Sequence, residues 1–230
     1  MTPPNLLTYF TEDERNSLCA DGWVLMQYKT IRAAAKDEFT EQRSRFIGRI
    51  APVTTEDEAT AFLAGVKAQE RDARHNVFAY VLQNGVRRCS DDGEPSGTGG
   101  VPSLEVLVRE GLCDVAVVIT RYFGGILLGA GGLVRAYSHA AKLAVDAADA
   151  VIISECRVLR LEMAYPFYGG VQRVLPRYNA RVQDSDFGAA VRLDVLIRAE
   201  RAQAFTDEII ELGAGSIPVT EHSVCFTELE

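Results

Sequence analysis

The chain has 230 residues, of which 47% are hydrophobic and 24% are charged, and these values exclude a wholly disordered protein. Its 24 basic and 32 acidic residues give a net charge of -8. This charge excludes tight non-specific coating of duplex DNA, because such coating needs many phosphate contacts from Lys and Arg.

The five cysteines are widely separated, and neither a CxxC pair nor a nearby Cys/His pair occurs. An odd, scattered set argues against a disulfide scaffold and against a zinc knuckle. The first residues show no basic segment followed by an apolar one, and no apolar run approaches the roughly 20 residues of a membrane helix. We therefore predict a cytoplasmic protein that does not enter a membrane.

The first part of the chain predicts an extension followed by two strands. Residues 1–20 are rich in Pro and charge and are expected to lie outside the core. Residues 24–33 and 43–50 have strand-like composition, and the polar segment 36–42 between them is predicted to be a turn.

A helix is predicted next, because Thr55 and Glu58 form a capping box. The apolar residues that follow have helical spacing: Ala59, Phe62, Leu63 and Val66. Strands are predicted over 76–82 and 86–89, on either side of a turn at Asn84 and Gly85.

Two Gly-rich loops, 90–100 and 121–132, flank a predicted short helix after Pro102 and a buried strand over 114–120. A long helix follows the second loop. Six residues share the face that we expect to pack against a sheet: Leu133, Ala136, Tyr137, Ala140, Ala141 and Ala144.

The last part of the chain predicts a ferredoxin-like βαββαβ domain. Its expected elements, in order, are strand 156–163, helix 167–175, strands 180–183 and 189–197, helix 205–212 and strand 217–226. The fold class is therefore α+β with two domains, over 21–149 and 150–230. Residues 1–149 hold 16 basic and 20 acidic residues, and 150–230 hold 8 and 12, so neither part is a basic module.

The first Gly-rich loop, SDDGEPSGTGG, is a candidate binding site. Its carboxylates Asp91, Asp92 and Glu94 are candidate ligands of a hard cation such as Mg²⁺. Alternatively, its backbone N–H groups and hydroxyls bind an anion, or the loop is an ordered surface turn whose side chains bond to local backbone. The candidate anion-binding residues are Ser96, Gly97, Thr98, Gly99 and Gly100.

The second Gly-rich loop, RYFGGILLGAGGLVR, lacks the dinucleotide fingerprint and contains no P-loop. One interpretation has Arg121 and Arg135 hold a phosphate while Tyr122 and Phe123 stack a base. In the alternative interpretation the two aromatic residues belong to the core and Arg121 pairs with the acidic loop. The candidate ligand-binding glycines here are Gly124, Gly125, Gly129, Gly131 and Gly132.

His75 and Asn76 stand at the start of a predicted strand, where the histidine is either a general base or a structural residue. No nucleophile–base pair can be assembled from spacing, so no catalytic residue is assigned and no cofactor is predicted. The sequence favours a non-catalytic protein.

Four segments carry a resemblance to a known family: RSRFIG (43–48), ARHNVFAY (73–80), SDDGEPSGTGG (90–100) and VVITRYFGGILLGAGGLVRAYSHA (117–140). With them the sequence resembles the IMPACT/YigZ family of bacterial two-domain proteins. The resemblance implies an N-terminal domain like that of a small-subunit ribosomal protein, with a left-handed βαβ unit. It also implies a C-terminal domain similar to the last domains of elongation factor G.

The resemblance implies a regulator of translation that binds RNA or ribosome-associated partners through the Gly-rich face of the N-terminal domain. Two alternatives stay open: an enzyme acting on a small phosphorylated or anionic substrate, and an adaptor that binds protein partners through the C-terminal sheet. Val101 and Leu127 stand where lysine is common in the family, which removes two positive charges from the candidate site.

Overall fold

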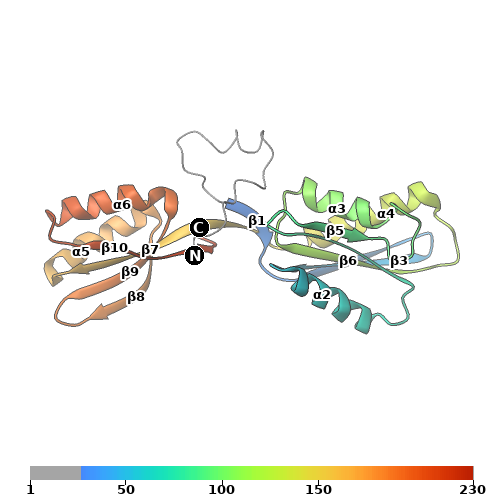
Figure 1. Ribbon diagram of the computed structural model, residues 1–230, viewed down its shortest axis with the longest axis horizontal. Helices are drawn as coiled ribbons and strands as arrows, with labels where there is room; N and C mark the ends of the chain where they lie inside the picture. Colours follow the sequence, from blue (N-terminus) through green and yellow to red (C-terminus); the bar gives the residue numbers. More distant parts are fainter. Residues whose placement is uncertain (1–26, 230) are drawn as a thin grey trace. The chain divides into compact units, whose positions relative to one another are not determined.

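The computed structural model describes residues 27–229, so the predicted extension 1–20 lies outside the described residues. The chain divides into two compact units (Figure 1): the described part of unit 1 is Tyr28–Val151, and unit 2 holds Gln27 and 152–229. Over 27–229, no helix is both long and apolar enough to span a membrane.

Unit 1 is built on one antiparallel sheet with the strand order β2-β3-β6-β4-β5. Because β3 and β4 are both antiparallel to β6, they run parallel to each other, and the helix between them makes a βαβ crossover. The strands of this sheet are β2 (Ala35–Glu41), β3 (Ser44–Pro52), β4 (His75–Val81), β5 (Arg87–Ser90) and β6 (Val115–Tyr122), and the short strand β1 (Gln27–Ile31) is not part of it.

The helices of unit 1 cover both faces of this sheet. Helices α3 (Gly100–Arg109) and α4 (Gly129–Asp146) lie on one face, and α2 (Glu56–Gln69) lies on the other (Figure 1). The predicted cap is present, because the Thr55 hydroxyl accepts a hydrogen bond from the Glu58 N–H at 3.2 Å. The Glu58 carboxylate also accepts a hydrogen bond from the N–H of Thr54 at 2.6 Å.

All six residues predicted for the sheet-facing side of α4 are buried. Their small size allows close packing: a Cβ added to Gly48 of β3 would lie 2.4 Å from the Ala140 carbonyl oxygen. Because Gly48 has no side chain and the facing α4 residues are mostly alanines, the backbone of α4 packs directly on that of β3.

The predicted polar turn at 36–42 is wrong, because most of this segment forms β2. The turn is only Gln42 and Arg43, both with positive φ. Strand β2 is at the edge of the sheet, and of its side chains only Ala35 and Phe39 pack against the core. An edge strand with a mostly exposed, charged sequence resembles a loop in composition.

Unit 2 confirms the predicted βαββαβ order. Its strands are arranged β10-β7-β9-β8 with antiparallel neighbours. The elements are β7 (Ala150–Met163), α5 (Tyr165–Val174), the 3-10 helix η2 (Leu175–Tyr178), β8 (Arg181–Phe187), β9 (Val191–Arg198), α6 (Ala199–Leu212) and β10 (Val219–Thr227). The core between the sheet and its helices includes Leu161, Val195 and Phe205.

Candidate functional site

A cavity of about 360 Å³ in unit 1 joins the two Gly-rich loops at the start of α4. We call it the Arg121 cavity. Its lining combines a few polar side chains with an apolar wall, which is the usual character of a ligand site. The lining residues are Arg74, His75, Glu94, Pro95, Arg121, Phe123, Leu127, Leu128, Gly129, Ala130 and Leu133.

Strand pairing places the polar residues of this cavity. Arg121 on β6 lies directly opposite His75 on β4 and directly opposite Phe46 on β3. Side chains alternate along a strand, so Tyr122 points to the other face of the sheet and contacts Glu70 through its hydroxyl at 2.5 Å. Phe123, the next residue, lines the cavity with Arg121.

Arg121 forms a buried ion pair with the acidic loop. Its Nη1 donates to Glu94 Oε1 at 2.6 Å, and the two side chains are 6% and 3% exposed. The guanidinium lies between two rings, 5.5 Å from the centroids of both Phe46 and Phe123. The predicted pairing of Arg121 with the acidic loop is therefore confirmed.

Glu94 also accepts a hydrogen bond from the Tyr137 hydroxyl at 2.8 Å. Burial, followed by the nearby Glu94 carboxylate, raises the pKa of Tyr137. The phenol therefore stays protonated and acts as a donor, so Glu94 Oε1 receives two hydrogen bonds from inside the protein.

His75 is held at one ring nitrogen and open at the other. Its Nδ1 lies 2.8 Å from the Asp92 carbonyl oxygen, which can only accept, so Nδ1 carries the hydrogen. Its Nε2 lies 3.9 Å from Glu94 Oε1 in the cavity. In the neutral ring Nε2 is then an acceptor of a hydrogen bond or a proton.

The three carboxylates of the first loop do not converge on one point. Asp91 accepts three backbone hydrogen bonds, from Gly97, Gly99 and Gly100, at 2.8–2.9 Å. Burial opposes its ionisation, but these bonds outweigh burial and lower the pKa of Asp91. The N–H groups of these three glycines, which were predicted to bind an external anion, are therefore already bound to an internal one.

Asp92 is similarly occupied, by the Asn76 N–H at 2.7 Å and the Lys67 ammonium at 2.8 Å. Within 27–229, no group of three or more His, Cys, Asp or Glu side chains is placed to hold a metal ion. The predicted cation site at Asp91, Asp92 and Glu94 is therefore wrong. Each carboxylate is bonded to a different structural partner, so the three do not converge on one ion.

Other predicted site residues lie outside the cavity. The Asn76 amide accepts from Thr120 on the sheet face that Tyr122 also occupies. Ser96 and Gly97 are exposed. The Thr98 hydroxyl donates to the Pro95 carbonyl at 2.6 Å. These contacts are structural.

The glycines of the second loop shape the chain. Gly124 approaches the backbone of Arg43 so closely that a Cβ would lie 2.1 Å from the carbonyl carbon and oxygen. Gly125 and Gly129 have φ values of +83° and +68°, which other residues rarely adopt. Of the five predicted glycines, Gly129 lines the Arg121 cavity, while Gly132 lines a second cavity.

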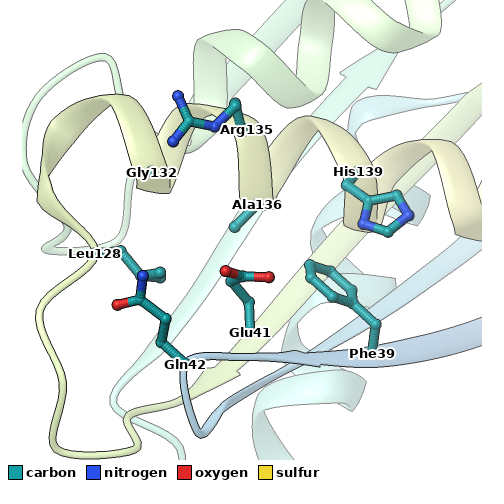
Figure 2. A pocket seen from close by; sticks show the side chains of 8 residues that line it. All are labelled: Phe39, Glu41, Gln42, Leu128, Gly132, Arg135, Ala136 and His139. Carbon is teal, nitrogen blue, oxygen red and sulfur yellow. The ribbon is translucent and has the colours of Figure 1, made fainter.

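This second cavity, of about 320 Å³, is the Arg135 cavity (Figure 2). In it the His139 ring lies beside the Phe39 ring, with centroids 4.4 Å apart. Its lining residues are Phe39, Glu41, Gln42, Leu128, Gly132, Arg135, Ala136 and His139. Arg121 and Arg135 thus line different cavities, which share only the lining residue Leu128.

Sequence reasoning missed Arg74, Leu128 and Tyr137 as residues of the site. Arg74 directly precedes His75, and its charge next to a candidate polar residue was an available signal. Tyr137 lies on the predicted buried face of α4, but helical spacing does not indicate that its hydroxyl bonds to Glu94.

Comparisons with known proteins define the family. Residues 42–145 match the Impact N-terminal domain, and 161–216 match a domain of unknown function, DUF1949. The chain is 34% identical over 207 residues to IMPACT family member YvyE of Bacillus subtilis, covering 89% of this chain and 95% of that protein. The chain belongs to the IMPACT family.

Other members agree with this assignment. IMPACT family member YigZ of Escherichia coli is 33% identical over 180 residues, covering 76% of this chain and 88% of that protein. Protein IMPACT of Homo sapiens is 32% identical over 97 residues, which is 39% of this chain and 30% of that protein. A crystal structure of a protein described as hypothetical is similar with a TM-score of 0.55 at 30% identity, covering 86% of this chain and 98% of that one.

The Arg121 cavity lies within the matched Impact N-terminal domain, because all of its lining residues fall between 42 and 145. The domain of unknown function contributes none of them. The candidate site of this IMPACT family chain is therefore a property of unit 1.

Proposed function

We propose that this IMPACT family protein binds single-stranded RNA at the Arg121 cavity and acts as a non-catalytic regulator associated with translation. The cavity of about 360 Å³ is of a size that holds a small ligand or one nucleoside. The predicted likeness of its two domains to a ribosomal protein and to elongation factor G supports a partner in the translation apparatus.

One observation carries the proposal: Phe123 is 45% exposed, and its ring is held over the buried Arg121 guanidinium. A ring fixed on one face and open on the other is suited to stacking a base, and such stacking does not depend on base identity. The apolar side chain of Leu127, 84% exposed, lines the same cavity beside it.

The backbone of the RNA would meet two sources of positive potential. Arg74 lines the cavity, and α4 begins there at Gly129 and Ala130. No side chain in the described part of the chain caps the first turn of α4, so its N–H groups are available to a phosphate. With so few cations, we expect binding to weaken only modestly as salt rises.

The test is fluorescence anisotropy with a labelled RNA single strand, titrated at low and at physiological salt. We expect saturable binding that Phe123→Ala weakens about fivefold or more, since base–aromatic stacking is worth roughly 1–3 kcal/mol per base. Phe226→Ala is the matched control, because Phe226 in unit 2 is also 45% exposed. A hairpin duplex of the same RNA should bind more weakly.

The proposal fails if the single strand does not bind, or if Phe123→Ala and Phe226→Ala change the Kd equally. The latter result would indicate a general loss of apolar surface and not a stacking site. Circular dichroism of both variants checks that the units remain folded.

A further inference from the structure

The floor of the Arg121 cavity carries two hydrogen-bond acceptors without internal donors. Glu94 Oε1 is fully used, because Arg121 and Tyr137 both donate to it. The hydrogen bonds that Glu94 accepts from side chains of 27–229 both end on Oε1, and Oε2 is not one of the fully buried polar atoms without a partner, so Oε2 is open to the cavity. Because a carboxylate oxygen in a buried side chain is poorly solvated, it gains from a donor supplied by a ligand.

The second acceptor is His75 Nε2. The hydrogen of the neutral ring is on Nδ1, where it is bonded to the Asp92 carbonyl, so Nε2 presents a lone pair. Nε2 lies 3.9 Å from the nearer Glu94 oxygen, and both residues line the same cavity. The two side chains are therefore neighbours in the lining of one cavity.

A group that satisfies two neighbouring acceptors from a single atom brings two hydrogens on that atom. A neutral amino group does this, whereas a carbonyl oxygen would be repelled by both. An ammonium ion is disfavoured because the charge of Glu94 is already balanced by Arg121, and Arg74 adds a further positive charge to the lining.

We propose that the Arg121 cavity selects nucleobases that carry an exocyclic amino group, with Glu94 Oε2 and His75 Nε2 accepting its two hydrogens. This inference rests on the proposed function, because Phe123 must stack the base whose amino group is read. Adenine, cytosine and guanine qualify, and uracil and hypoxanthine do not.

The test compares wild-type Kd values within pairs of RNA strands of equal length that differ at this group. Oligocytidine and oligouridine form the first pair. Oligoadenosine and an oligomer of purine riboside, which lacks the amino group, form the second. We expect the Kd of the amino-bearing member of each pair to be lower by about fivefold or more.

Equal Kd values within both pairs, or a preference for uracil, would overturn the inference. If Phe123→Ala still weakened binding in that case, the proposed function would stand without it. Absence of binding by every strand would instead reject the proposed function itself.

Variants at the histidine give a second readout that does not depend on overall affinity. His75→Phe keeps a ring but removes the acceptor, so the cytosine-to-uracil ratio of affinities should fall towards one. His222→Phe in β10 is the matched control and should keep the wild-type ratio. An unchanged ratio in His75→Phe would show that His75 does not read the amino group.

Discussion

The Arg121 guanidinium lies 2.6 Å from the Glu94 carboxylate, although the two residues are 27 positions apart in the chain. Both side chains are almost fully buried, and the pair links the second Gly-rich loop to the first. Both side chains line the Arg121 cavity, so the pair fixes part of its floor.

Breaking this pair should destabilise unit 1 strongly. Arg121→Met leaves the Glu94 charge buried without a cation, which typically costs about 3–5 kcal/mol. The free energy of unfolding in urea measures this. Glu38→Ala is the control, because it removes the exposed 2.7 Å pair with Arg45, which water and salt screen, and should cost far less. Equal losses in the two variants would contradict the structural role of the buried pair.

Asp91 should make stability depend on acid pH. The pKa of its carboxyl is lowered from 3.8, so its contribution is present at neutral pH and is lost as pH falls below about 4 through the folded-state value. Asp91→Asn should cost about 1–3 kcal/mol at neutral pH, because the new amide group would face the Gly97 N–H with a donor. Free energies of unfolding from neutral pH to about pH 3 would test both effects.

The dependence of the free energy of unfolding on acid pH is the control for Asp91→Asn. Asp92 also has a lowered pKa, so the Asn variant should retain part of the acid dependence while its slope becomes shallower. A slope identical to that of the wild type would mean that Asp91 does not carry the effect.

Gly124 should tolerate no side chain. Gly124→Ala places a Cβ 2.1 Å from the Arg43 backbone, which cannot move without displacing the turn between β2 and β3. We expect a loss of about 1–3 kcal/mol or more. Gly65→Ala is the contrasting change: nothing lies within 4 Å of its added Cβ inside α2, so it should stabilise by roughly 0.5–1 kcal/mol. Thermal unfolding of the two variants would show shifts of opposite sign.

Arg74 and Arg135 should differ in their effect on RNA binding. Arg74 lines the Arg121 cavity, whereas Arg135 lines the separate Arg135 cavity. Arg74→Ala should raise the Kd and flatten its salt dependence, while Arg135→Ala should leave both unchanged. Titrations at two salt concentrations measure this, and equal effects would indicate diffuse electrostatic attraction instead of a located site.

Local patterns predicted most of the secondary structure correctly. The capping box at Thr55 and the apolar face of α4 depend on contacts within one or two turns, so spacing alone identifies them. Strand β2 was missed because an edge strand needs an apolar side chain only where it meets the core, and Phe39 alone is a weak signal.

The sequence by itself determined the family, the two-unit α+β fold and the segments that form the candidate site, because these follow from motifs and from local periodicity. Only the tertiary structure decided which side chains in those segments face one another. Strand pairing set His75 opposite Arg121, and strand alternation turned Tyr122 away from Phe123. Arg121 and Arg135 line different cavities. Such relationships depend on register and on the direction of side chains between distant segments, which no local pattern specifies.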